Sequence, residues 1–144
     1  MYSTILVALE NSPTDDAILR HIRPLAKVHG ASLVLVHVAD GFAARYQEGL
    51  NLEDSEEIRK DRAYLARCQR ELESDGFRVA TALEKGDPAT GLIAAAVRER
   101  CDLIAMATHG HGPVSDLLRG SVADKVRHST DIPVLMLRAR RPAG

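Results

Sequence analysis

Two glycine-containing segments in the C-terminal third of the chain carry residue types that suit anion binding. Thr108-His109-Gly110-His111-Gly112-Pro113 is small and polar, and Gly120-Ser121-Val122 follows within a short helical stretch. Glycine lets the backbone approach an anion and direct its N–H groups at it. Ser121 as the N-cap of a fresh helix would add a hydroxyl at the positive end of the helix dipole. A polyphosphate could therefore be cradled between these two glycine sites.

A plain turn explains the same glycines without a ligand. Gly110 and Gly112 are typical of a turn, and Gly120 is typical of a helix break. The chain has no G-x-x-x-x-G-K-S/T phosphate loop, and Gly110-His111-Gly112 lacks the third glycine of a dinucleotide-binding fingerprint. The spacing alone leaves both interpretations open.

Residues for catalysis or for a dedicated metal site do not emerge from the pattern. His109 and His111 have no neighbouring carboxylate or Cys, which makes a weak zinc site, and a loop position or a bond to phosphate suits them better. Ser121 has no His-plus-carboxylate pair to activate it as a nucleophile. No general base or arginine finger for phosphoryl transfer is identifiable, so we expect hydrolysis of a bound polyphosphate to be slow at most. Mg²⁺ would arrive with the phosphates.

Four apolar runs of strand length and one partly alternating segment, residues 77–84, are interspersed with helical patterns along the 144 residues. The expected strands are residues 5–9, 32–38, 77–84, 103–107 and 133–137. The expected helices are residues 13–29, 55–74, 88–97 and 117–128, with a loop over 39–52. Such alternation predicts right-handed crossovers between parallel strands covered on both faces. The fold class is therefore α/β: one domain over residues 1–144, a doubly wound five-stranded parallel sheet with helices on both faces.

Capping patterns mark two helix starts. Ser12 as N-cap, Pro13 at the first helical position and Asp15 in a capping box open the first helix, which Gly30 can close. Asp87-Pro88 repeats the cap-then-proline pattern.

Composition argues against several classes of function. The chain has 19 Lys and Arg against 20 Asp and Glu, a formal net charge of −1, so nucleic-acid binding by bulk electrostatics has little support. Cys68 and Cys101 match no metal or redox spacing. No secretory signal or membrane span is visible, and we expect a cytoplasmic location.

Ligands of doubly wound sheets bind outside the carboxyl ends of the strands, where the winding reverses. The candidate edges are residues 9–11, 38–40, 86–87 and 107 onward. Asp102 precedes the fourth strand at its amino end, and we expect it to lie away from the site. His37 is expected to be a packed residue at a strand end.

Three blocks of sequence resemble the universal stress protein family. They are Ile5-Leu6-Val7-Ala8-Leu9-Glu10-Asn11-Ser12, then Met106-Ala107-Thr108-His109-Gly110 followed after nine residues by Gly120-Ser121-Val122-Ala123, and finally Ile132-Pro133-Val134-Leu135. His37-Val38 also matches the family's second strand end. The resemblance implies a Rossmann-like fold of the adenine nucleotide alpha hydrolase type. It also implies a homodimer formed by antiparallel pairing of the last strands, here Val134 to Leu137.

Nucleotide-binding members of that family carry the pattern G-x-x-G-x9-G-S/T. Gly110, Gly120 and Ser121 match its second glycine, its third glycine and its hydroxyl residue, and Val122 would add a backbone N–H to the phosphates. Ala107 stands where the pattern has its first glycine, which is a departure.

The adenine and ribose end of the family's site also has counterparts here. Glu10 matches, one methylene longer, an Asp near adenine and ribose, and Val38 matches a position whose backbone reads the adenine edge. The cofactor-binding residues that the resemblance implies are Ala8, Leu9, Glu10, Val38, Met106, Ala107, His109, Gly110, His111, Gly120, Ser121 and Val122.

Two functions from different classes follow. One is a regulatory or stress-response module that binds ATP, ADP or AMP, with cyclic nucleotides left open. The other is a dimeric stress or adaptor protein without a nucleotide, which the departures at Ala107 and Glu10 favour. A slow ATPase or a flavin carrier ranks third, because only 3% of the residues are aromatic and stacking partners for a flavin are lacking. An unidentified protein partner is compatible with either of the first two.

Overall fold

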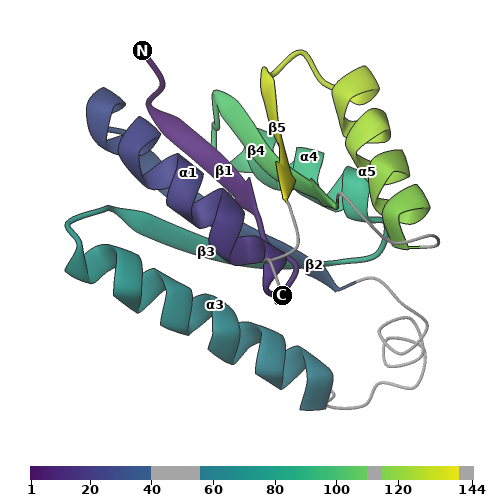
Figure 1. Cartoon of the computed structure of the whole chain (residues 1–144), viewed down its shortest axis with the longest axis horizontal. Coiled ribbons are helices and arrows are strands. Elements are labelled where there is room, and N and C mark those ends of the chain that lie inside the picture. Colours follow the sequence, from purple (N-terminus) through teal and green to yellow (C-terminus); the bar gives the residue numbers. More distant parts are fainter. Residues whose placement is uncertain (40–55, 110–114, 140–144) are drawn as a thin grey trace.

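The computed structural model describes residues 1–39, 56–109 and 115–139, with the backbone alone for residues 109 and 115–121. Within these ranges, five strands form one sheet in the order β3-β2-β1-β4-β5, and each neighbouring pair runs parallel (Figure 1). The strands are β1 (Thr4–Ala8), β2 (Ser32–Ala39), β3 (Val79–Lys85), β4 (Leu103–His109) and β5 (Val134–Ala139). The helices are α1 (Thr14–His29), α3 (Glu56–Ser74), α4 (Pro88–Arg98) and α5 (Ser115–Ser129). The predicted α/β class is confirmed, and the expected loop over 39–52 falls outside the described residues from residue 40 onward.

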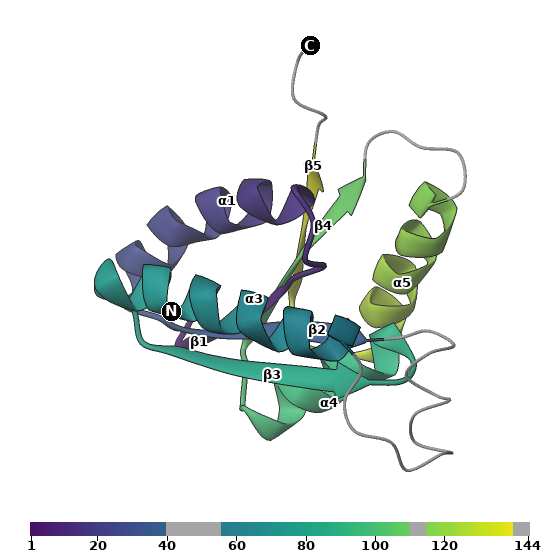
Figure 2. The same cartoon turned by 90° about the horizontal axis from the view of Figure 1, so that it is seen from below.

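Two aliphatic layers hold the helices to the sheet. On one face, Ile5 and Val7 pack with Ile18 and Ile22 of α1 and with Leu65 of α3. The other face of the sheet carries a second cluster, made of Leu6, Val34, Val36 and Ile104 from the strands, Leu92 and Ala95 from α4, and Ala123 and Val126 from α5. Alternate residues of β1 thus point into opposite layers, and Figure 2 shows α1 and α3 on one side of the sheet and α4 and α5 on the other. Burial on both faces explains why the strands read as continuous apolar runs.

The winding of the sheet reverses between β1 and β4. The chain runs from β1 to β2 to β3 in one direction and then returns to place β4 on the other side of β1. Ile5 and Val7 of β1 are opposite Leu103 and Ala105 of β4. The carboxyl ends of these two strands therefore meet at the switch point, where such sheets bind ligands.

The helix α5 corrects one expectation. It runs without a break from Ser115 to Ser129, so the predicted fresh start at Gly120 is wrong and Ser121 is an interior residue rather than an N-cap. Glycine inside a helix costs about 1 kcal/mol relative to Ala. The burial of Val126, which is 0% exposed, contributes about 1.5–3 kcal/mol and outweighs that cost.

The starts of α1 and α4 differ, although their sequences looked alike. Asp87 caps α4 as predicted, because its carboxylate accepts the backbone N–H of Thr90 at 2.9 Å. The N-cap of α1 is Pro13, which makes no side-chain cap bond, so the predicted cap by Ser12 is wrong. Gly30 ends α1 as expected, with a φ of 63°. No helix in the described ranges is long and apolar enough to cross a membrane.

Candidate functional site

The turn that leaves β1 is shaped by one buried carboxylate. Asp15, only 1% exposed, accepts the backbone N–H of Glu10 at 2.9 and 3.1 Å, that of Asn11 at 2.8 Å and that of Ser12 at 3.4 Å. The Asp15 carboxylate thus serves three donors, and the contact to the Ser12 N–H is the one that the predicted capping box assigns to Asp15. The Ser12 hydroxyl donates to Glu10 Oε2 and does not cap the helix. The N–H groups of this turn are consequently occupied from inside the protein, and an anionic ligand would have to find its donors elsewhere.

A tyrosine from α3 completes the shell around Asp15. The Tyr64 hydroxyl donates to Asp15 Oδ2 at 2.6 Å. Burial raises the pKa of the Asp15 carboxyl, and the bonds from Tyr64 and from the turn oppose part of that rise. Burial and the neighbouring Asp15 raise the pKa of the Tyr64 phenol well above its usual range. The phenol therefore stays a hydrogen-bond donor at every physiological pH.

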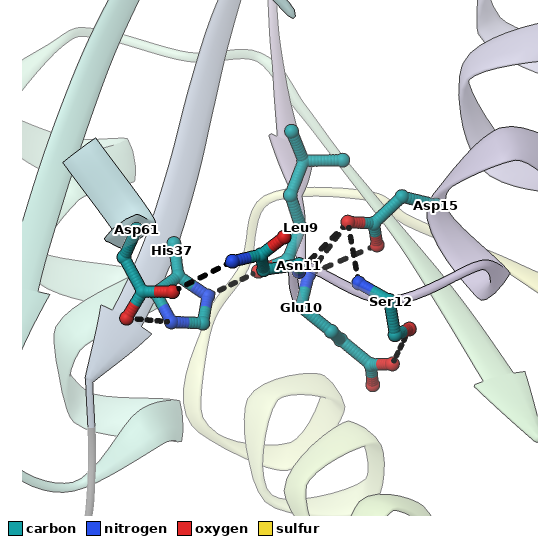
Figure 3. Close-up of polar contacts among 7 residues, drawn as sticks. All are labelled: Leu9, Glu10, Asn11, Ser12, Asp15, His37 and Asp61. Atoms are coloured by element: carbon teal, nitrogen blue, oxygen red, sulfur yellow. Dashed lines mark hydrogen bonds and ion pairs between the residues drawn. The ribbon is translucent and has the colours of Figure 1, made fainter. Parts of the chain in front are cut away.

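A second polar chain runs from the end of β2 to α3. The Nδ1 atom of His37 donates to the carbonyl oxygen of Leu9 at 2.8 Å, and its Nε2 atom lies 3.2 Å from Asp61 Oδ2. Asp61 Oδ1 accepts the Nδ2 amide of Asn11 at 3.0 Å (Figure 3). Asn11 has a φ of 62°, a left-handed conformation that Asn tolerates better than most residues. His37 was expected to be a packed residue only, and its two hydrogen-bonding contacts are a role that the sequence did not reveal.

Glu10 and Ser12 form the part of the turn that points the other way. Ser12 Oγ donates to Glu10 Oε2 at 3.1 Å, and Figure 3 shows the Glu10 side chain extending away from the His37–Asp61 pair. Both residues are half-buried. The turn thus presents a carboxylate, which accepts hydrogen bonds, at the switch point.

The other predicted site residues fall into three groups. Leu9 and Met106 are 3% and 5% exposed, so their side chains belong to the core and only their backbone faces the edge. The Leu9 N–H is itself bonded to Val36 O at 2.8 Å. The half-buried group consists of Ala8 at the end of β1, Val38 in β2, Ala107 in β4 and Val122 in α5. Of the remainder, His109, Gly120 and Ser121 are described by their backbone alone, and Gly110 and His111 lie outside the described residues.

The structure brings part of the predicted set together through strand pairing. Ala8 ends β1, and β1 is flanked by β2, which carries Val38, and by β4, which carries Ala107. Asp102 lies at the opposite end of the sheet, as expected, and accepts the backbone N–H of Ser3 at 2.9 Å. Among the residues that the structure describes, no group of three or more His, Cys, Asp and Glu side chains is placed to hold a metal ion.

Sequence reasoning missed Asp61 and Tyr64, although one signal was available. Ile58, Leu65, Cys68 and Leu72 form the buried stripe of α3, and Asp61 occupies a position on that stripe with 7% exposure. A carboxylate is rarely buried without a partner. Its place among apolar residues could have pointed to a polar contact with the turn.

Comparisons with known proteins agree with this geometry. The universal stress protein family matches residues 1–138. A universal stress protein of Thermus aquaticus is 32% identical over 138 residues, which cover 96% of this chain and 100% of that protein. The solved structure of a universal stress protein from Methanocaldococcus jannaschii superposes with a TM-score of 0.81 at 26% identity, covering 100% of this chain and 99% of the other.

A third relative is a protein of the universal stress protein family from Burkholderia pseudomallei, whose crystal structure is known. It has a TM-score of 0.67 at 30% identity and covers 94% of this chain and 96% of that one. The same fold thus extends over nearly the whole length of these two solved relatives. The chain belongs to the universal stress protein family.

Proposed function

We propose that this protein binds an adenine nucleotide at the carboxyl ends of β1 and β4 and acts as a regulatory or stress-response module, with slow hydrolysis at most. The observation that carries the proposal is the switch point itself. There the turn with the Glu10 carboxylate follows β1. The strand β1 pairs with β4, and β4 leads into the glycine-containing segment.

The proposed site divides into two ends. The Glu10 carboxylate would accept hydrogen bonds from ribose hydroxyls, and the backbone of Val38 would face the adenine edge. The phosphates would take donors from the Gly110 N–H and from the Ser121 hydroxyl, and Gly120, which has no side chain, would let them approach α5 closely. Donors for the phosphates are needed there, because the N–H groups of the β1 turn already serve Asp15.

Two solved relatives support an adenine ligand. A universal stress protein in complex with cAMP has a TM-score of 0.72 at 17% identity, and one from Archaeoglobus fulgidus in complex with dAMP has a TM-score of 0.69 at 20% identity. Both ligands carry adenine and one phosphate, whereas the sugar is ribose in cAMP and 2′-deoxyribose in dAMP, and the phosphate is cyclic only in cAMP. For this chain we therefore propose ATP, ADP or AMP as the cofactor, with Mg²⁺ carried by the phosphates.

A dimeric adaptor without a nucleotide is the second candidate. The Ala107 side chain packs against the core cluster on the α1 and α3 face, so its methyl group occupies space that glycine would leave open. The strand β5 lies at the edge of the sheet, where a second copy could pair with it. Retained nucleotide after purification separates the two candidates.

The test is a thermal melt with and without millimolar ATP and Mg²⁺. A ligand at 100 times its dissociation constant stabilises the folded state by about 2.7 kcal/mol, which raises Tm by roughly 5–10 °C. The double variant Gly120→Ala, Ser121→Ala should lose this shift.

Its basal Tm should not fall, since Ala is favoured over Gly inside a helix by about 1 kcal/mol. Ser129→Ala, at the far end of the same helix, is the matched control and should keep the shift. No shift in the parent protein, together with nucleotide-free protein by mass spectrometry, would favour the adaptor.

A further inference from the structure

The β1 turn is held from α3 as well as from its own helix. Asp15, on α1, gathers the N–H groups of the turn, but the groups that fix Asp15 and Asn11 in place are Tyr64 and Asp61 of α3. Tyr64 is 49 positions from Asp15 in the chain, and Asp61 is 50 positions from Asn11. The turn therefore depends on a helix that follows it only after β2.

Both contacts come from neighbouring turns of one helix and lie in shielded surroundings. Asp61 is 7% exposed and bridges Asn11 of the turn and His37 of β2, while Tyr64 reaches Asp15 from the next turn of the helix. Both ring nitrogens of His37 face oxygen acceptors, the Leu9 carbonyl and the Asp61 carboxylate, so His37 links the end of β1 to the same helix. Hydrogen bonds with charged partners in such surroundings are the stronger ones.

We propose that the amino-terminal half of α3 is the element that positions the β1 turn for its ligand. Asp61 and Tyr64 are then positioning residues, which act through Asn11 and Asp15 and touch no ligand themselves. The coupling to the ligand rests on the proposed nucleotide binding. Because binding free energies are reciprocal, a ligand that needs the ordered turn must also favour the docked position of α3.

The first measurement needs no ligand. Hydrogen exchange of the Glu10, Asn11 and Ser12 amides, followed by NMR, reports how firmly the turn is held. Asp61→Asn and Tyr64→Phe keep the volume of the side chains and remove one charge or one hydroxyl. We expect exchange at these amides to become about tenfold faster in each variant, the size of effect that one lost charge-assisted hydrogen bond produces.

The matched control removes a different hydrogen bond of the same helix. Gln69 Nε2 donates to Val79 O of β3 at 2.9 Å, away from the turn. Gln69→Leu should leave exchange at the three turn amides unchanged. The amide of Leu35, in the buried middle of β2, reports the global stability in every variant and corrects for any general loosening of the fold.

The second measurement adds ATP with Mg²⁺. The dissociation constant should rise about tenfold in Asp61→Asn and in Tyr64→Phe, in step with the exchange at the turn, and stay unchanged in Gln69→Leu. In the parent protein, ATP should slow exchange in the amino-terminal half of α3.

The outcomes separate this proposal from the proposed function. Unchanged exchange at the turn in both α3 variants would overturn the positioning role, whether or not ATP binds. Faster exchange with an unchanged dissociation constant would overturn the coupling. A parent protein that binds no nucleotide would refute the proposed function and the coupling with it, while faster exchange at the turn in the same protein would still support the positioning role.

Discussion

Gly91 decides how closely α4 packs on the end of β2. A Cβ atom at this position would lie 3.2 Å from Cγ2 of Val38 and 3.3 Å from Cβ of Glu84, closer than carbon atoms normally pack. The Val38 side chain can move at a strand end, whereas the Cβ of Glu84 is tied to its backbone. A single missing methyl group thus sets the position of a residue that we propose to face adenine.

Gly91→Ala should therefore destabilise the protein despite the better helix propensity of Ala. Propensity favours Ala by about 1 kcal/mol, and overpacking costs about 1–3 kcal/mol, so we expect a net loss of about 1 kcal/mol. Urea denaturation measures the difference. Ala94→Gly, at an exposed position of the same helix, measures the propensity contribution by itself. A Gly91→Ala variant more stable than the parent would mean that the neighbours yield without cost.

Single residues also mark the limit of what the sequence could predict about the site. Glu10 and Val38 were placed at strand ends correctly, because the ends of apolar runs are visible in the sequence. Asp15 was predicted as part of a capping box, and its contact to Tyr64 was not predicted. Contacts between residues 49 positions apart depend on how α3 lies against the sheet, which no local pattern encodes.

The two cap-then-proline patterns show the same limit for helices. Asp87 caps α4 because its carboxylate is at the N-cap position itself. In the first helix the N-cap candidate was a serine hydroxyl, and Ser12 Oγ donates to Glu10 Oε2 instead of capping the helix. Helix existence was predictable from periodicity, whereas the hydrogen-bond partner of the Ser12 hydroxyl required the geometry.

The cap of α4 should make the stability of the protein depend on acid pH. The backbone N–H and hydroxyl of Thr90, with Lys125 Nζ at 3.2 Å, lower the pKa of the Asp87 carboxyl to about 2, below its value of about 3.9 in an unfolded chain. A depressed pKa means that the stabilisation is present above pH 4 and is lost as the pH falls toward 2.

Asp87→Ala should cost about 1 kcal/mol at pH 7, the usual value of an N-cap, and clearly less at pH 2, where about half of the carboxyl is protonated. Urea denaturation at a series of pH values checks this. Asp124→Ala is the control: this exposed carboxylate pairs with Arg127 at 3.3 Å within one helix and should contribute only a few tenths of a kcal/mol. An equal loss for Asp87→Ala at both pH values would show that its carboxylate is not what caps the helix.

The whole sheet has two edges, β3 and β5, and they are chemically different. Met136 of β5 is 41% exposed and lies among apolar neighbours, whereas β3 exposes Ala80 and Thr81. An apolar edge strand is prone to pair with another copy. Homodimerisation through Val134 to Leu137 therefore remains our prediction.

Met136→Asp should convert the dimer to a monomer, because the Asp carboxylate would be desolvated in the interface. Size-exclusion chromatography with light scattering gives the mass of each species. Thr81→Asp places the same charge on the other edge and should leave the dimer intact. Loss of the dimer in Thr81→Asp alone would assign the interface to β3.

The overall architecture was more predictable than the arrangement of its parts. Alternating strands and helices predict a parallel sheet covered on both faces. Four of the strands occur where apolar runs predicted them, and β3 occurs where partial alternation did. The order β3-β2-β1-β4-β5 does not follow from alternation, because β4 could pair with either edge by the local patterns alone. The position of the switch point, and with it the site, is a property of the folded whole.

The long-range hydrogen bonds that hold the β1 turn also affect the order in which the chain folds. During synthesis β1 and α1 leave the ribosome before α3. Asn11 and Asp15 therefore lack their hydrogen-bond partners Asp61 and Tyr64 until α3 has been made. Closing such loops is entropically unfavourable and comes after local structure. The turn is therefore completed only after α3 has been made, and a nascent chain that ends before Tyr64 cannot present the finished turn.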